Sequence, residues 1–144
     1  MKSWLFAVCA CAAAFPSLGI AQSKDNLVGT WKLVSVLSRT DKGDINKDAH
    51  GTNPVGFLTY TPEGRVSVVI AEDGRKPLSV ADRVSAPIEE RAQAYSTFHA
   101  CAGHYTFTGD KVIHHVEVAS LPNEVNTDQV RLVKLQGDRL NRCS

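Results

Sequence analysis

Residues 55–71 read VGFLTYTPEGRVSVVIA and contain two β-type runs separated by a turn. The runs Val55–Thr61 and Val66–Ala71 are rich in β-branched and aromatic side chains, which favour strands. Pro62 and Gly64 lie between the runs at positions that suit a type I or type II turn. This stretch therefore predicts a β-hairpin.

Five further runs of the same kind lie on either side of the hairpin. They are Leu33–Leu37, His104–Thr108, Val112–Ala119, Gln129–Leu135 and Arg139–Cys143. Polar or glycine-containing segments separate them at fairly regular spacing. Short strands in this arrangement are typical of an all-β domain, so we expect an antiparallel up-and-down barrel or a sandwich.

One helix is predicted, over Pro87–Ala100, between the third and fourth strands. Ser85 is placed to cap it, and acidic residues at 89 and 90 suit its positive end. Helical spacing puts Ile88, Ala92, Tyr95 and His99 on one stripe. We expect this face to pack against the sheet or close one end of a barrel.

The N-terminal residues have the pattern of a cleavable signal peptide. Lys2 precedes the uncharged apolar run Trp4–Ala14, and small residues end at Ala21. The run is shorter than the roughly 20 residues that span a bilayer. We therefore expect a signal peptide over residues 1–21, one domain over residues 22–144, and a periplasmic or secreted protein.

Charge and cysteine content narrow the classes of partner. The chain has 16 Lys and Arg against 15 Asp and Glu, and loss of Lys2 would make these numbers equal. Nucleic-acid binding would show as a clustered basic excess and is therefore not expected. A membrane span is not expected either, because no segment after the predicted signal peptide is apolar enough. Cys101 and Cys143 would remain after cleavage, either as separate thiols or as a disulfide.

Five stretches in order resemble the bacterial and fungal lipocalin-like domain family. They read LVGTWKL (27–33), NPVGFLTYTPEGR (53–65), HHVE (114–117), TDQVR (127–131) and GDRL (137–140). The resemblance covers nearly all of the chain after the predicted signal peptide. It implies a small antiparallel up-and-down β-barrel, and most members of the family have no assigned activity.

The resemblance also raises a question about closure. Family members usually continue past the GDRL strand with another turn and a closing strand, whereas this sequence stops at Ser144. We therefore expect a barrel that is either closed in another way or left one strand short. An open strand edge would favour self-association.

Alternation along two strands predicts the polar residues of the interior. In Val112–Val118 the more apolar face carries His114 together with Val112, Val116 and Val118, which leaves His115 and Glu117 outside. In the next strand Gln129 and Arg131 are expected inside, across a hairpin from His114. A buried arginine needs an acceptor, either Glu117, Glu124 or a carbonyl, or an anionic ligand.

The predicted function is binding of a small hydrophobic or amphipathic molecule with an acid or carbonyl group inside the barrel. Its predicted contacts are His114, Gln129, Arg131, Trp31, Tyr60 and Tyr105. His114 is also compatible with a core histidine, and the three aromatic residues with plain packing. The alternatives are an isomerase or cyclase using His114 and Arg131, and a closed-core barrel acting as an interaction or stress module. No cofactor or metal is expected, because no metal-ligand motif is recognisable.

Overall fold

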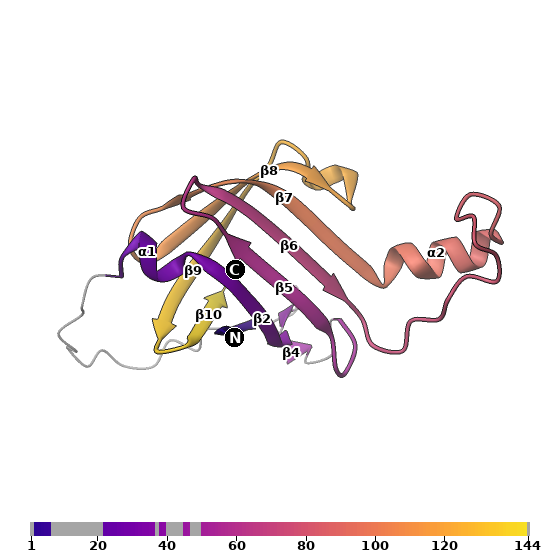
Figure 1. The fold of residues 1–144 in the computed structure, drawn as a ribbon, viewed down its shortest axis with the longest axis horizontal. Coiled ribbons are helices and arrows are strands. Elements are labelled where there is room, and N and C mark those ends of the chain that lie inside the picture. Colours follow the sequence, from indigo (N-terminus) through magenta and orange to yellow (C-terminus); the bar gives the residue numbers. More distant parts are fainter. Residues whose placement is uncertain (1, 7–21, 37, 40–44, 47–49, 144) are drawn as a thin grey trace.

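The chain folds as a β-barrel from which one helix projects (Figure 1). The computed structural model describes residues 2–6, 22–36, 38–39, 45–46 and 50–143. Seven antiparallel strands form a nearly closed barrel in the order β2–β5–β6–β7–β8–β9–β10. Their bounds are Gly29–Val36, Val55–Tyr60, Arg65–Ala71, Phe98–Phe107, Lys111–Ala119, Asp128–Gln136 and Arg139–Cys143. The prediction of an all-β up-and-down barrel is confirmed.

The gap between the first and last of these strands is filled by β1 (Lys2–Phe6). This strand pairs in parallel with β10 on one side and with β2 on the other, which completes the ring. Residues 7–21 lie outside the described residues. Cleavage near Ala21 stays a prediction. Along the chain, β2 and β5 are separated by a pair of two-residue strands, β3 (Ser38–Arg39) and β4 (Ile45–Asn46), which form a sheet of their own.

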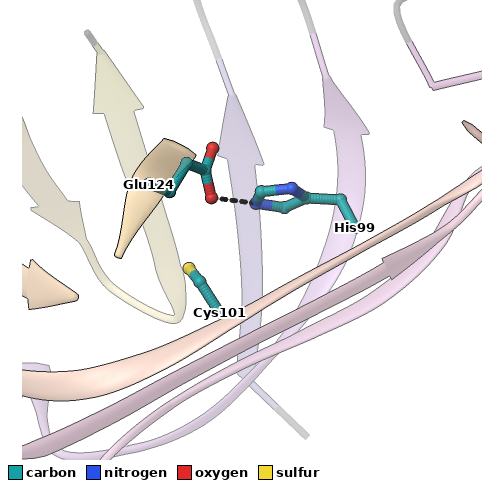
Figure 2. Close-up of side chains that lie close together, drawn as sticks. All are labelled: His99, Cys101 and Glu124. Carbon is teal, nitrogen blue, oxygen red and sulfur yellow. Dashed lines mark ion pairs between the residues drawn. The ribbon is translucent and has the colours of Figure 1, made fainter. Parts of the chain in front are cut away.

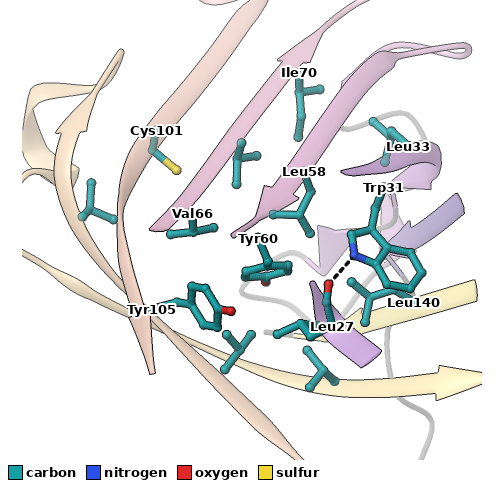
Figure 3. Packing of buried hydrophobic residues seen from close by; sticks show 14 of the residues in the cluster. Leu27, Trp31, Leu33, Leu58, Tyr60, Val66, Ile70, Cys101, Tyr105 and Leu140 are labelled. Atoms are coloured by element: carbon teal, nitrogen blue, oxygen red, sulfur yellow. Dashed lines mark hydrogen bonds between the residues drawn. The ribbon is translucent and has the colours of Figure 1, made fainter. Parts of the chain in front are cut away.

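The hairpin predicted from residues 55–71 is present as β5 and β6, with Tyr60 paired to Val66. Along both strands alternate side chains are buried, as expected when one face of a sheet lines a core. The barrel interior holds the apolar core, which includes Trp31, Leu58 and Leu140 (Figure 3). The short helix α1 (Lys24–Leu27) precedes β2 and adds Leu27 to this core.

Helix α2 (Ile88–Ser96) lies between β6 and β7, the third and fourth antiparallel strands, as predicted. The predicted length of this helix is wrong, and so is the prediction that one of its faces packs against the sheet or closes one end of the barrel. The chain is extended from Phe98 onward in β7, so His99 lies on a strand. The helix has no buried residue and projects away from the barrel (Figure 1). Pro87, not Ser85, stands at its N-cap, and the Ser85 hydroxyl donates to the Asp82 carboxylate.

A β-bulge alters the facing of β8. The register slips by one residue between Ala102 and Gly103, so that Ala102 pairs with Val118 and Gly103 with Val116. Glu117 is the additional residue on β8. Val118 consequently faces outward with 61% of its surface exposed, and its predicted inward position is wrong. His114 and Val116, which precede the bulge, face inward as predicted.

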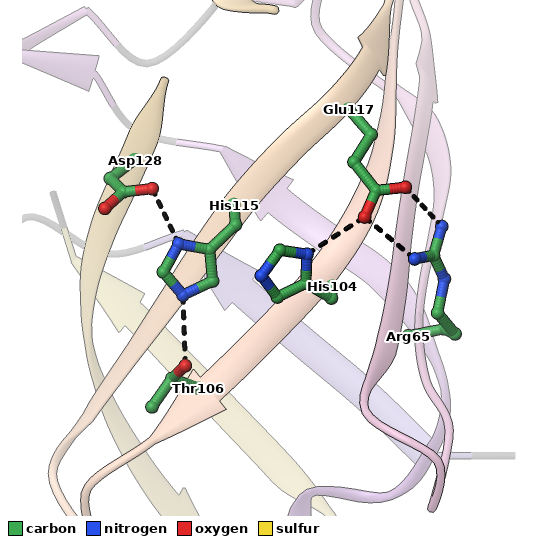
Figure 4. Close-up of polar contacts among 6 residues, drawn as sticks. All are labelled: Arg65, His104, Thr106, His115, Glu117 and Asp128. Carbon is green, nitrogen blue, oxygen red and sulfur yellow. Dashed lines mark hydrogen bonds and ion pairs between the residues drawn. The ribbon is translucent and has the colours of Figure 1, made fainter. Parts of the chain in front are cut away.

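The outer face of β8 carries a polar cluster with its neighbours on β6, β7 and β9 (Figure 4). Glu117 accepts two hydrogen bonds from Arg65, each 2.8 Å long, and lies 2.9 Å from His104 Nδ1. The His104 ring stacks on that of His115, with ring centroids 4.4 Å apart. His115 Nδ1 lies 2.6 Å from Asp128 Oδ1. The predicted outward positions of His115 and Glu117 are thus confirmed.

Candidate functional site

A cavity of about 250 Å³ is bordered by residues of the barrel strands β6, β7, β9 and β10, together with His50 and Glu124. We refer to it as the interior cavity. It is lined by His50, Val68, Ile70, His99, Cys101, Glu124, Gln129, Arg131 and Arg142. Six of these nine residues are polar or charged: two arginines, two histidines, one glutamine and one glutamate. Val68, Ile70 and Cys101 supply the apolar part of the wall. A hollow in which polar groups converge beside apolar side chains can hold a small molecule.

The strand pairing of β8 with β9 brings together the polar residues predicted from sequence. His114 pairs directly with Gln129, and Arg131 lies two residues further along β9, opposite Val112. Arg131 donates one hydrogen bond of 3.0 Å to Gln129 Oε1 and another of 3.0 Å to the Val130 carbonyl. Gln129 therefore holds the guanidinium of Arg131 against the cavity wall.

Arg131 retains unused hydrogen-bonding capacity. Its Nε atom is buried and has no hydrogen-bond partner among the described residues. Glu117, considered as its partner from sequence, is bound to Arg65 on the outside of the barrel. Burial lowers the pKa of Arg131, and the smaller effects of Cys101, Tyr60 and Glu124 oppose this shift. Glu124 lines the same cavity.

The second guanidinium belongs to Arg142 on β10, which is only 2% exposed. Burial, with a smaller effect of the positive charge of Arg131, lowers its pKa to about 10, so the group is still charged at pH 7. The Tyr60 hydroxyl interacts with it through a hydrogen bond. Two cations therefore share one small cavity, with Glu124 as the carboxylate that lines it.

A family model described as a lipocalin-like domain matches residues 28–143. The chain belongs to the lipocalin-like domain family. No curated protein and no solved structure matches it. The expected family resemblance is thus confirmed. The seven antiparallel strands described above are the lipocalin-like barrel of this chain.

His114 is buried inside the lipocalin-like barrel and does not line the interior cavity. It is 1% exposed, and its Nε2 atom lies 2.7 Å from the Tyr60 hydroxyl. Burial, followed by the charges of Arg142 and Arg131 and by His115, lowers the pKa of His114 to about 2. The imidazole is therefore neutral at pH 7 and too weak a base for proton transfer. This placement gives no support to an isomerase or cyclase that uses His114.

The aromatic residues proposed as ligand contacts pack in the core and do not line the interior cavity. Trp31 Nε1 donates to the Leu27 carbonyl at 2.8 Å (Figure 3). Tyr105 donates its hydroxyl hydrogen to the Thr61 carbonyl at 2.9 Å. Tyr60 packs edge-on against Tyr105, with ring centroids 4.8 Å apart. Burial raises the pKa of Tyr60 to about 12. Of the six predicted contacts, the cavity wall includes Gln129 and Arg131.

Sequence reasoning missed Arg142 as an interior residue. The signal was present, because Arg142 is two positions from Leu140 on a short strand and alternate residues share a face. It also missed His99, which was predicted at the end of the helix, and Cys101, which was assigned to no element. Both belong to the extended segment that begins at Phe98 and face the cavity from β7.

A larger hollow of about 450 Å³ lies outside the lipocalin-like barrel, between α2 and residues 72–78. Its charged lining residues are Glu72, Asp73, Arg75, Lys76, Glu89 and Glu90. Arg75 reaches across it and donates to the Ala94 carbonyl. Opposite charges are mixed here, and one wall is a helix without buried residues. The interior cavity is the better candidate site, because barrel strands form its walls and its lining includes the buried Arg131 Nε, which has no hydrogen-bond partner among the described residues.

Among the described residues, no helix has both the length and the apolar composition needed to cross a bilayer.

Proposed function

We propose that this lipocalin-like barrel binds a small, largely apolar molecule through a carboxylate or carbonyl group in the interior cavity. The observation that carries the proposal is the buried Nε of Arg131, which has no hydrogen-bond partner among the described residues and belongs to a cavity-lining guanidinium. A buried donor of this kind costs free energy until an acceptor occupies the cavity.

Charge supports an acidic group in preference to a basic one. The positive charge of Arg131 contributes to the lowered pKa of Arg142, and Glu124 is the one carboxylate in the cavity lining given above. A ligand carboxylate would offset this repulsion and accept charge-assisted hydrogen bonds. Val68 and Ile70 supply apolar wall for the rest of the molecule. A volume of about 250 Å³ is just below the range of drug-sized pockets, roughly 300–1,000 Å³, so the ligand is small.

Benzoate and its neutral counterpart benzamide provide a direct test by titration calorimetry on the purified chain. We expect benzoate to bind more tightly than benzamide. Replacement Arg131→Gln should weaken benzoate binding by about 10- to 100-fold, since a hydrogen bond to a charged group contributes about 1.5–3 kcal/mol. Arg65→Gln is the matched control, because Arg65 is an exposed arginine on the outer face. Equal affinities for the two probes, or equal effects of the two variants, would refute the proposal.

The natural ligand can be sought independently by native mass spectrometry of the purified protein. The proposal expects a co-purifying small acid or carbonyl compound in the wild-type chain and its loss from Arg131→Gln. A spectrum of protein alone from every preparation would count against it.

We further propose that the chain is exported to the periplasm or the medium. The support is the N-terminal pattern of one lysine, an apolar run and a small-residue exit ending at Ala21. Intact-mass measurement of protein recovered from outside the cytoplasm tests this, and the expected species begins at Gln22. Recovery of the full chain from the cytoplasm alone would reject the proposal.

A further inference from the structure

Three side chains that ligate metals in other proteins converge at one wall of the interior cavity (Figure 2). His99 and Cys101 are two residues apart on β7 and share a face, as alternation requires. Glu124 reaches them from the 3₁₀ turn η1 (Pro122–Glu124), which joins β8 to β9. The candidate donor atoms of all three residues lie within 4.8 Å of one another.

Contacts within this cluster do not satisfy its polar atoms. His99 Nε2 is 3.9 Å from Glu124 Oε2, a separation too long for a hydrogen bond. That carboxylate oxygen is buried and has no hydrogen-bond partner among the described residues. Cys101 is a buried free thiol. Buried carboxylate oxygens are normally paired, so an unpaired one beside an imidazole and a thiol needs a further partner.

We propose that His99, Cys101 and Glu124 bind a divalent transition metal ion, with Zn²⁺ as the representative. Thiolate, imidazole and carboxylate are all zinc ligands, with metal–ligand distances of about 2.0–2.3 Å. A tetrahedral ion at such distances separates its ligand atoms by about 3.5 Å. The His99–Glu124 pair is only a few tenths of an ångström wider than this. The donor atoms of the three residues lie within 4.8 Å of one another, so side-chain rotations of about an ångström would bring all three to one ion.

Metal binding forms one bond to each of the three side chains, and the thiol proton of Cys101 leaves to solvent. The thiolate and the carboxylate together carry two negative charges, which balance the charge of the ion. The nearby guanidinium groups of Arg131 and Arg142 then face a centre without net charge, so their repulsion of the bound ion is small.

Three protein ligands leave the fourth tetrahedral position of the ion open. This position lies on the cavity side, because all three ligands line the interior cavity. His50 lines the same cavity, with its ring centroid 6.3 Å from that of His99. The inference goes beyond the binding of an organic acid and does not depend on it, since the metal ion alone is the probe.

Titration of the full chain with Zn²⁺ in competition with a chromophoric chelator tests the proposal. One equivalent of Zn²⁺ should bind per chain. With Co²⁺ as a spectroscopic substitute, a near-ultraviolet thiolate-to-metal band should appear. Cys101→Ser should abolish this band, and His99→Gln and Glu124→Gln should each weaken Zn²⁺ binding by at least about tenfold. Far-ultraviolet circular dichroism checks that each variant is folded.

Matched controls separate this site from other possible ligands of the chain. Cys143→Ser tests the other cysteine near the C-terminus, and His104→Gln tests an exposed imidazole on the outer face. Both should retain the Co²⁺ band and the Zn²⁺ affinity. If Cys101→Ser does not fold, Glu124→Gln decides, because Glu124 lies on a short turn and is partly exposed. Unchanged affinity in Glu124→Gln, or loss of the band in Cys143→Ser, would overturn the proposal.

Discussion

The Tyr60 hydroxyl lies 2.7 Å from Nε2 of His114, and both side chains are almost completely buried inside the barrel. This is a hydrogen bond between β5 and β8, strands that are separated in the sheet by β6 and β7. It therefore joins opposite parts of the barrel wall across the interior. The Nδ1 atom of His114 is buried without a hydrogen-bond partner among the described residues, so Tyr60 is the contact that anchors this imidazole.

Replacing Tyr60 with Phe should lower the free energy of unfolding by about 1–3 kcal/mol, because it leaves Nε2 of His114 buried without its partner. Urea denaturation at pH 7 measures the effect. Tyr95→Phe is the matched control, since Tyr95 is 53% exposed on α2, and it should change stability by less than about 0.5 kcal/mol. Equal effects of the two substitutions would show that the Tyr60–His114 bond does not contribute to stability.

The lowered pKa of His114 makes stability depend on pH. The pKa of His114 is about 2 in the folded state against an ordinary histidine value of 6.5, so below pH 6.5 the unfolded chain binds a proton that the folded chain excludes. The part of the free energy of unfolding that depends on neutral His114 is present in full above pH 6.5 and is lost as the pH falls toward 2. Within this range the free energy of unfolding decreases by about 1.4 kcal/mol per pH unit. His50, whose pKa is also lowered by burial, acts in the same direction.

Denaturation of wild type and His114→Gln at several pH values from 7 to 5 tests this effect. The variant should be less stable at pH 7 but should lose less stability as the pH falls. Identical pH slopes for the two proteins would contradict the assignment of His114 as a neutral buried base.

The polar cluster on the outer face of β8 gives a second acid-dependent contribution to stability, through Glu117. Hydrogen bonds from Arg65 and His104 lower the pKa of Glu117 to about 2. The contribution of this carboxylate is therefore present above its ordinary pKa of 4.5 and is lost as the pH falls toward 2. Replacing Arg65 with Gln should raise the pKa of Glu117, as measured by the carboxyl carbon chemical shift during an NMR titration. An unchanged titration curve would show that Arg65 does not hold the carboxylate in its charged form.

The bulge at Ala102 and Gly103 should not tolerate a side chain at residue 103. A Cβ atom there would lie 1.9 Å from the backbone oxygen of His115. We expect Gly103→Ala to cost about 3 kcal/mol or more, since the strands β7 and β8 must separate locally. Gly137→Ala is the comparison, because it has a positive φ of 61° but open space around it, and should cost about 1–2 kcal/mol. Similar thermal shifts for both variants would contradict the steric argument.

Removal of β1 should expose two strand edges. A chain that starts at Gln22 lacks the partner of both β2 and β10. Unpaired edges of this kind favour pairing between molecules. Sedimentation velocity should therefore show more dimer or higher species for residues 22–144 than for the full chain at equal concentration. Leu5→Pro in the full chain should act in the same direction, because proline interrupts a strand ladder. Matching distributions for all three proteins would refute this expectation.

Much of the barrel was predictable because its strands bury alternate residues. The hairpin at residues 55–71 and the inward positions of His114, Gln129 and Arg131 depend on this period of two. Val118 was misplaced because a bulge inserts one residue; Gly103, a glycine within β7, is the local sign of the bulge that the prediction did not use. The packing of α2 was also mispredicted, since helical spacing reports the faces of a helix but not whether any face finds a partner.

The candidate site was predictable only in part, because its residues come from separate elements. Arg131 was found by its strand face, whereas Arg142 lies on a strand of five residues near the C-terminus. Glu124 lies on η1 and Cys101 on β7, 23 positions away, yet their donor atoms lie within 4.8 Å of each other. Their proximity depends on how η1 and β7 are arranged in the folded protein, and no local sequence pattern predicts this arrangement.

The position of β1 has a consequence for strand direction. The seven antiparallel strands begin and end with strands that run the same way, and β1 runs parallel to both. Parallel pairing is slightly less stable per residue than antiparallel pairing. An extended segment in the position of β1 that ran antiparallel to β2 and β10 would therefore form more stable ladders with both of these strands. Of all the strands in this barrel, β1 is thus the one that an incoming peptide can best replace.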